Sequence, residues 1–116
     1  MAVTYLFAGL PVSDFAGAQD WYTRLLGREA DMLPHETEAV WRLTPNSAIY
    51  VVEDSARAGS GLVTVALDDL DEQADRMREM RIDFTELQAD NAPRRLKVTD
   101  LDGNTLTFFD DPGQRP

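Results

Sequence analysis

The chain has 116 residues, a formal net charge of −10, a pI near 4.3 and no cysteine. A chain of this length is expected to form one domain whose core needs no disulfide or structural metal, and the absence of cysteine excludes thiol nucleophiles and zinc–cysteine sites. The acidic charge disfavours nucleic-acid binding, because it repels phosphate backbones.

No apolar run reaches the roughly 18 residues of a membrane span. Residues 1–14 lack the pattern of a signal peptide, so we expect a cytoplasmic protein without a membrane partner.

The first predicted elements are a strand and an amphipathic helix. Residues 3–12 are rich in strand-forming side chains, and Pro11 predicts a bulge, an edge position or the end of this strand. The segment SDFAGAQDWYTRLLG follows, with Ser13 or Asp14 as the N-cap of a helix that ends at Gly27. Its apolar residues recur at helical spacing: Phe15, Ala18, Trp21, Tyr22, Leu25 and Leu26. We expect the two adjacent aromatic residues of this stripe to pack inside the protein rather than contact a ligand.

Three extended segments are predicted next, near residues 29–33, 38–43 and 48–53. The Pro-Asn-Ser stretch at 45–47 predicts a hairpin turn between the last two. The small, polar and glycine-containing segment DSARAGSG then predicts a linker.

The same order of elements then repeats. Residues 62–67 predict a strand, and Asp69 with Glu72 forms the capping box of a second helix. The apolar stripe of this helix consists of Leu70, Ala74, Met77 and Met80 or Arg81. Extended pieces follow at IDFTEL, RRLKVT and NTLTFF, and the aperiodic tail DDPGQRP is expected to fray.

The repeated pattern predicts an α+β fold made of two βαβββ modules in one domain. The expected boundaries are module 1 at about 1–54, a linker at 55–61, module 2 at about 62–110 and a tail at 111–116. Aligning the two modules places Phe7 on Leu62 and Tyr50 on Thr107.

Three segments carry a family resemblance: LPVSDFAGAQDWYTRLLG, VALDDLDEQADRMREMRIDF and VTDLDGNTLTFF. In this order and spacing they resemble the vicinal oxygen chelate superfamily, which groups glyoxalase I, bleomycin resistance proteins and extradiol dioxygenases. The resemblance implies that both modules curl into a cupped, mostly antiparallel sheet and that the protein dimerises. It also implies that many relatives hold a divalent metal in the cup, through ligands on the first and last strand of each module.

By this resemblance the metal-ligand positions are Phe7, Tyr50, Leu62 and Thr107. None of them is His, Glu, Gln or Asp, which supply the usual nitrogen and oxygen ligands of such metals. We therefore expect no cofactor. Mn, Fe, Zn or Ni would be bound only if other residues supplied the ligands.

The sole histidine and the only basic cluster are interpreted as solvated surface. His35 lies in a polar link between two predicted strands, although with Glu36 or Glu38 it could serve as a general base at the mouth of the cup. For the basic segment RRLK, we favour solvation over anion capture.

The inside of the cup is the expected ligand site, since alternate residues of a strand share one face. The candidate ligand-binding residues are Phe7, Trp41, Tyr50, Val52, Leu62, Thr64, Thr107 and Phe109. Their pattern leaves open which face Trp41 takes, and the same side chains could instead fill the cavity as core. An open pocket of this composition suits an aromatic or cationic small molecule.

These observations favour a metal-free binding protein that sequesters a drug or metabolite, as in antibiotic resistance, over an enzyme. The alternative is a metal-dependent lyase, isomerase or dioxygenase of the glyoxalase type with non-standard ligands. A third interpretation is a dimerisation module with a filled cavity. The expected partners are a small-molecule ligand and a second copy of the chain in a homodimer, with no nucleic acid.

Overall fold

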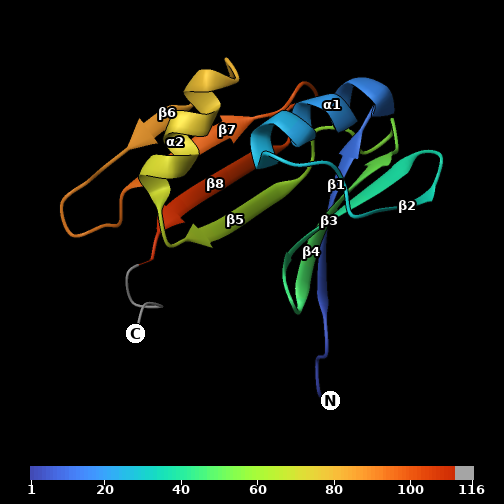
Figure 1. Cartoon of the computed structure of the whole chain (residues 1–116), viewed down its shortest axis with the longest axis horizontal. Helices are drawn as coiled ribbons and strands as arrows, with labels where there is room; N and C mark the ends of the chain where they lie inside the picture. Colours follow the sequence, from blue (N-terminus) through green and yellow to red (C-terminus); the bar gives the residue numbers. More distant parts are fainter. Residues whose placement is uncertain (112–116) are drawn as a thin grey trace.

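The computed structural model describes residues 1–111 of the chain. These residues form two modules with the same order of elements (Figure 1). The first module consists of β1 (Leu6–Val12), α1 (Phe15–Leu26), β2 (Met32–His35), β3 (Glu38–Thr44) and β4 (Ser47–Glu53). The second consists of β5 (Leu62–Leu67), α2 (Leu70–Glu79), β6 (Thr85–Leu87), β7 (Arg95–Thr99) and β8 (Thr105–Asp110). A loop at residues 54–61 joins them.

Each module forms its own four-stranded sheet, sheet A in the first module and sheet B in the second. The strand order is β1-β4-β3-β2 in sheet A and β5-β8-β7-β6 in sheet B. In both sheets the first strand runs parallel to the fourth, and the other neighbouring strands are antiparallel. β1 is therefore an edge strand, which accommodates Pro11 because a proline has no backbone N–H to donate.

Both helices begin at the aspartates that cap them. Asp14 accepts a hydrogen bond from the backbone N–H of Gly17 at 3.2 Å, and Asp69 accepts one from that of Glu72 at 3.1 Å. These bonds satisfy backbone donors that have no partner within the helix. α1 ends at Gly27, whose φ of 77° lies in the left-handed region that glycine adopts most easily.

A single hydrophobic cluster joins the two modules. It contains the inward face of each sheet and the buried stripe of each helix, including Trp21, Tyr22 and Trp41. The helices contact each other, and the Gln73 side chain donates to the carbonyl of Leu25 at 3.1 Å. Because each sheet turns one face to this cluster, strand alternation leaves the other face outside it.

The predicted α+β fold of two βαβββ modules is confirmed. As predicted, Trp21 and Tyr22 are buried, with 6% and 0% exposure. The first strand begins only at Leu6, because its partner strand begins opposite that residue. Most of the predicted tail, residues 112–116, lies outside the described residues. Within the described part of the chain, neither helix is long and apolar enough to cross a membrane.

One strand lies further along the chain than predicted. The strand expected near residues 29–33 is found at Met32–His35. Asp31 accepts hydrogen bonds from the side chain of Arg28 at 2.8 Å and from the backbone N–H of Arg42 at 2.6 Å. These bonds hold Arg28 and Asp31 in a bend, so β2 starts only at Met32.

Candidate functional site

Face A, the exposed side of sheet A, carries three of the predicted ligand-binding residues: Phe7, Tyr50 and Val52. Residues paired across neighbouring strands point to the same side, and β1 pairs with β4 so that Gly9 lies opposite Tyr50 and Pro11 opposite Val52. The Tyr50 ring lies over Gly9, where an added Cβ would stand 2.6 Å from the Tyr50 hydroxyl oxygen. Phe7 is 55% exposed. Along β1 and β4, face A therefore presents apolar and aromatic surface.

Face B, the exposed side of sheet B, carries four more of them: Leu62, Thr64, Thr107 and Phe109. β5 pairs with β8 so that Thr64 lies opposite Thr107. On the other side of β8, β7 places Lys97 opposite Thr107 and Arg95 opposite Phe109. Face B therefore combines hydroxyl groups with two basic side chains, whose place in the middle of a sheet face the sequence analysis did not anticipate.

A groove of about 430 Å³ lies where the two modules meet. It is lined by residues of β1, β4, the connecting loop and the start of β5: Gly9, Pro11, Tyr50, Val52, Asp54, Arg57, Ser60, Gly61 and Leu62. The groove thus brings Tyr50 and Val52 of face A together with Leu62 of face B. The strands contribute apolar side chains to its lining and the loop contributes polar ones, so the groove is mixed in character.

Trp41 is the one predicted ligand-binding residue that stands on neither exposed face. It is 0% exposed, and its ring lies 6.1 Å from that of Tyr22 inside the core. Its Nε1 donates a hydrogen bond to the carbonyl oxygen of Arg28 at 2.9 Å. Because the side chain is enclosed on the inward side of β3, Trp41 is left out of the ligand site proposed below.

The four positions at which the family resemblance places metal ligands do not fit a metal ion. Phe7 and Leu62 have no donor atom, and Tyr50 and Thr107 offer only hydroxyl groups, which bind divalent metals poorly when neutral. Among residues 1–111, no group of three or more His, Asp or Glu side chains is placed to hold a metal ion. No chemical step is therefore assigned to a metal.

His35 stands at the end of β2, at the outer edge of sheet A. Its Nε2 lies 3.0 Å from a carboxylate oxygen of Glu38, and its Nδ1 lies 3.4 Å from the hydroxyl of Thr37. The His35 side chain is 56% exposed. Of its two predicted partners, Glu38 rather than Glu36 makes the contact. The pair has the geometry of an oriented base, but neither residue lines the groove.

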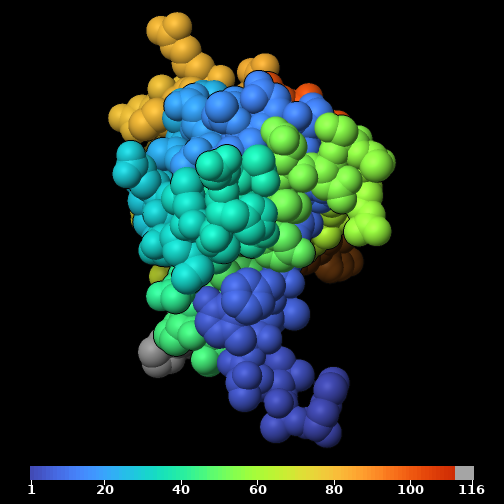
Figure 2. All heavy atoms as spheres, turned by 90° about the vertical axis from the view of Figure 1, so that its right-hand side faces the viewer, coloured from blue at the N-terminus to red at the C-terminus, as the bar shows by residue number. Residues whose placement is uncertain are grey.

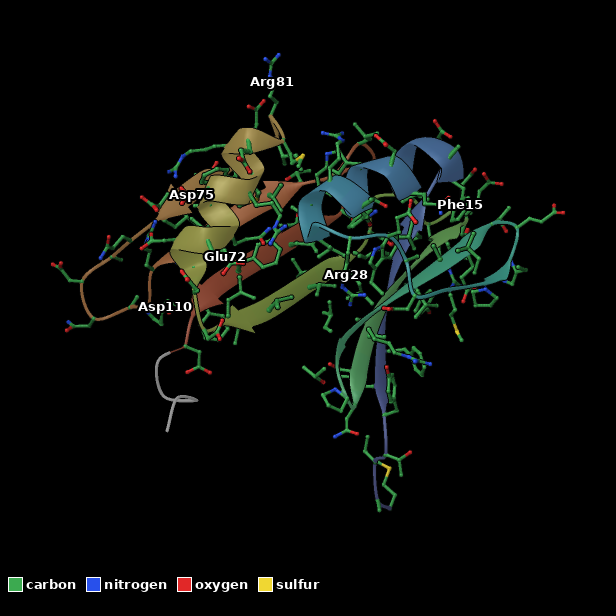
Figure 3. The ribbon with its side chains drawn as sticks, viewed as in Figure 1. Phe15, Arg28, Glu72, Asp75, Arg81 and Asp110 are labelled. Atoms are coloured by element: carbon green, nitrogen blue, oxygen red, sulfur yellow. The ribbon has the colours of Figure 1, made fainter. Side chains whose placement is uncertain are left out.

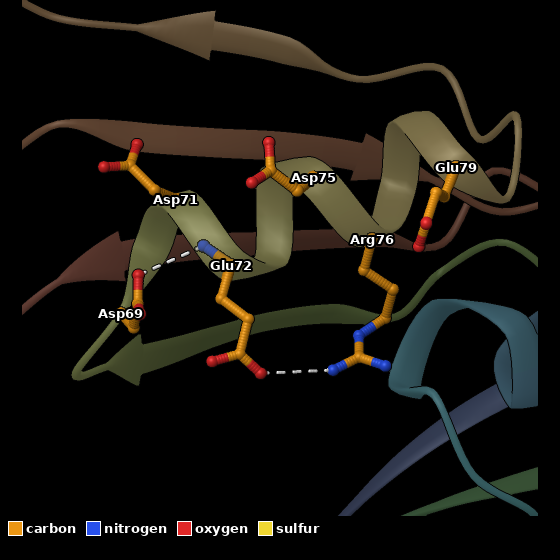
Figure 4. A pocket seen from close by; sticks show the side chains of 6 residues that line it. All are labelled: Asp69, Asp71, Glu72, Asp75, Arg76 and Glu79. Carbon is orange, nitrogen blue, oxygen red and sulfur yellow. Dashed lines mark hydrogen bonds and ion pairs between the residues drawn. The ribbon is translucent and has the colours of Figure 1, made fainter.

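A second hollow, of about 370 Å³, follows the exposed side of α2 (Figure 4). Acidic side chains and one arginine line it: Asp69, Asp71, Glu72, Asp75, Arg76 and Glu79. Asp69 caps the helix, and Glu72 pairs with Arg76 at 3.4 Å. Acids at a helix N-terminus are stabilised by the helix dipole, so this hollow is explained as a solvated helix surface.

A smaller hollow of about 250 Å³ lies between the inward sides of the two sheets. Ile49 of sheet A and Phe108 of sheet B line it. Arg28, which is labelled in Figure 3, is a further lining residue. It continues the hydrophobic core and contains none of the predicted ligand-binding residues.

Asp100 is the centre of a buried hydrogen-bond network. One of its carboxylate oxygens accepts from the backbone N–H groups of Asp102, Gly103 and Asn104, at 2.9, 3.0 and 2.9 Å. The other accepts from the hydroxyl of Tyr22 at 2.7 Å and from the side-chain amide of Asn104 at 2.8 Å. The network therefore ties the turn before β8 to helix α1 of the other module.

Asn104 extends this network to β1 and to the residue that precedes β5. Its side chain is fully buried, donates to the carbonyl of Pro11 at 2.7 Å and accepts from the N–H of Gly61 at 2.7 Å. The backbone N–H of Ser13 donates to Asp102 at 3.1 Å. These bonds fix the end of β1 beside the start of β5, and with it the groove between them. The sequence analysis used this segment only for the family resemblance and did not anticipate the network.

The Tyr22 hydroxyl is expected to make stability fall at high pH. Burial and the hydrogen bond to Asp100 raise the pKa of Tyr22 far above its usual range. In the unfolded chain a tyrosine loses its proton near pH 10, so above this pH the folded state holds a proton that the unfolded state lacks. The free energy of unfolding should then fall by about 1.4 kcal/mol per pH unit because of Tyr22.

Urea unfolding between about pH 9 and pH 11 measures this slope. The Tyr22→Phe variant should lack the contribution, whereas Tyr50→Phe, which removes a tyrosine of face A, should keep it. Equal slopes in the two variants would contradict the assignment.

Two βαβββ modules, each with one exposed sheet face beside a shared groove, define a protein of the vicinal oxygen chelate superfamily. The chain is similar to the crystal structure of a glyoxalase/bleomycin resistance protein from Catenulispora acidiphila DSM 44928, with 37% sequence identity and a TM-score of 0.89. The match covers 93% of this chain and 98% of that chain. This protein therefore belongs to the glyoxalase/bleomycin resistance protein family. No protein-family model and no curated protein sequence matches the chain.

More distant solved structures share the fold alone. TnmS3, an antibiotic binding protein from Streptomyces sp. CB03234, is 20% identical with a TM-score of 0.75, over 95% of this chain and 98% of that chain. A lactoylglutathione lyase from Agrobacterium tumefaciens is 15% identical with a TM-score of 0.75, over 99% of this chain and 98% of that chain. One of these proteins is named for binding and the other for catalysis, so the fold does not choose between them.

Proposed function

We propose that the protein binds a small molecule, a drug or a metabolite, without a metal and sequesters it in the groove and on the faces beside it. The observation that carries this proposal is the groove itself, in which Tyr50, Val52 and Leu62 provide apolar walls. Such walls bind flat ligands by stacking and by burial of apolar surface. The residues at the expected metal positions offer no carboxylate or imidazole ligand. We extend the proposal to a role in antibiotic resistance by analogy with the antibiotic binding protein that shares the fold, and we expect that role to be exercised in the cytoplasm.

A second copy of the chain would complete this site. Phe7 and Leu62 are large apolar residues, yet they are 55% and 79% exposed in the single chain. The N-terminal segment projects from the body of the protein (Figure 2), and its Val3 is 68% exposed. Exposed apolar surface of this kind favours association. We therefore infer a homodimer, which sedimentation equilibrium of the full chain would detect; a monomer at micromolar concentration would contradict it.

The binding function is tested by a ligand screen on the full chain. We expect aromatic drugs and metabolites to raise the melting temperature, because a ligand that binds only the folded state stabilises it. No shift across a library of such compounds would contradict the proposal. Elemental analysis of protein purified without chelators tests the alternative of a metal-dependent enzyme. About one tightly bound Mn, Fe, Zn or Ni per chain would favour that alternative over metal-free binding.

Tyr50 offers a direct test of the groove. Replacing Tyr50 by alanine should weaken the binding of an aromatic hit about tenfold, because aromatic contacts are worth about 0.5–1.5 kcal/mol beyond the buried area. Isothermal titration calorimetry measures the change. Leu101→Ala is the control, because Leu101 is a large apolar residue on the surface, 71% exposed, that lies in the turn before β8 and does not line the groove. Equal affinities in the two variants would place the ligand elsewhere.

A further inference from the structure

Within residues 1–111, the strands of sheet B turn basic and hydroxyl side chains but no acidic side chain to face B, although the protein has a net charge of −10. Strand pairing places five threonines on it: Thr64, Thr85, Thr99, Thr105 and Thr107. The same pairing places Arg95 and Lys97 there. The acids of these four strands, Glu86 and Asp110, stand opposite Leu96 and Leu67 on the inward side. Face B is therefore locally cationic within an acidic molecule.

Arg95 and Lys97 of face B differ from most other basic residues of the described chain, because neither forms a salt bridge with a described residue. Six arginines are paired with aspartate or glutamate: Arg24, Arg28, Arg57, Arg76, Arg78 and Arg94. Arg95 has no such pair, and its Nε atom, like that of Arg76, is buried without a hydrogen-bond partner among residues 1–111. A buried donor without a partner is costly, so Arg95 is a group that an incoming anion would satisfy.

Arg95 and Lys97 are close enough to hold one anionic group together. They are two residues apart on β7, so their backbone positions are about 7 Å apart on one face. Two like charges so placed repel each other, and an anion between them removes that cost. Thr107 and Thr85 lie opposite Lys97 on the two neighbouring strands. Their hydroxyl groups can donate further hydrogen bonds to the same anion.

We propose that Lys97 and Arg95 bind a carboxylate of the ligand, which is therefore an organic anion with an apolar body. This inference rests on the proposed function and specifies its ligand class. Leu62, which lines the groove, lies on β5, and Lys97 lies two strands away on β7. Lys97 is also displaced by two residues along the strand direction, so the two backbone positions are about 12 Å apart. A ligand with two fused or linked rings can span this distance. Its body contacts the groove and its carboxylate receives charge-assisted hydrogen bonds on face B. This revises the interpretation of the RRLK segment as solvated and of the ligand as aromatic or cationic.

Three matched probes test the charge of the ligand: 2-naphthoate, neutral 2-naphthamide and cationic 2-naphthylmethylamine. Each is titrated into the full chain by calorimetry at low salt. We expect 2-naphthoate to bind at least about tenfold more tightly than the other two, because charge-assisted hydrogen bonds are roughly twice as strong as neutral ones. Its affinity should fall as sodium chloride is added, since salt screens exposed charges.

Variants then assign the effect to face B. Lys97→Gln and Arg95→Gln should each weaken 2-naphthoate about tenfold and leave 2-naphthamide unchanged. Arg81→Gln is the control, because Arg81 also lacks a salt bridge among the described residues but projects from the end of α2 away from the body (Figure 3). It should bind all three probes like the unmodified protein.

Two results would overturn the inference. The first is that 2-naphthoate binds no more tightly than the other two probes, or that none of the three binds. The screen of aromatic compounds tests the proposed function separately. The second is a change in the oligomeric state of Lys97→Gln or Arg95→Gln in sedimentation, with unchanged 2-naphthoate affinity. That outcome would mean that face B binds acidic residues of a second copy of the chain.

Discussion

Replacing Asp100 by alanine should lower the free energy of unfolding by about 4 kcal/mol. The Asp100 carboxylate accepts five hydrogen bonds, three from the backbone of its own turn and one each from Tyr22 and Asn104. Each donor left without a partner in a buried position costs about 1–3 kcal/mol, and part of this cost is recovered where water can enter. Such a loss is a large share of the 5–15 kcal/mol that stabilises a typical domain.

Urea unfolding at pH 7 measures this loss, with two variants for comparison. Asp100→Asn keeps the shape but replaces one acceptor by a donor, so its loss should be smaller than that of Asp100→Ala. Asp83→Ala removes an exposed carboxylate and should change stability by less than about 0.5 kcal/mol. Equal losses at Asp83 and Asp100 would show that the network does not hold the modules together.

Replacing Trp41 by alanine should cost a similar amount, about 4 kcal/mol, because a large side chain leaves a cavity in a packed core. Trp41 is 0% exposed, contacts the Tyr22 ring and donates its Nε1 hydrogen to Arg28. Trp41→Phe retains most of the volume but leaves the Arg28 carbonyl without this donor, so it should cost about 1–2 kcal/mol. Urea unfolding of both variants gives the two values.

Trp41→Phe also separates a core role from a ligand-binding role. The variant remains folded, so its affinity for an aromatic hit should equal that of the unmodified protein. In the same titration Tyr50→Ala should bind about tenfold more weakly. A loss of affinity in Trp41→Phe that matched the loss in Tyr50→Ala would return Trp41 to the ligand site.

Local signals in the sequence were sufficient for the elements and their order. Asp14, Asp69 and Gly27 are helix-terminal residues whose preference arises from the backbone at that position, so they locate helix ends without tertiary information. The strand at 62–67 alternates around Thr64 and is found with the predicted bounds. The strand near 29–33 was misplaced because Asp31 bonds to Arg42, a contact between separate segments that no local pattern contains.

The face of β3 could not be predicted, because its pattern does not alternate. Ala39, Val40 and Trp41 are three apolar residues in succession, and all three are buried. Only the pairing of Val40 with Tyr50 places Val40 on face A and turns Trp41 inward. Similarly, the sequence showed Arg95 and Lys97 as part of one basic run with Arg94. The structure separates them, because Arg94 pairs with Asp71 and Glu86 and the other two stand on face B.

The sequence by itself determined the repeated modules, their helix ends, the family resemblance and the lack of metal-ligating side chains at Phe7, Tyr50, Leu62 and Thr107. These features depend on residue identity and on spacing within one segment. The tertiary structure alone decided which residues share a face, how Asp100 and Asn104 fasten one module to the other, and where the groove opens. These features depend on contacts between residues far apart in the chain, such as Tyr22 with Asp100 and Asn104 with Pro11. Such contacts form only when the packing of both modules brings the segments together.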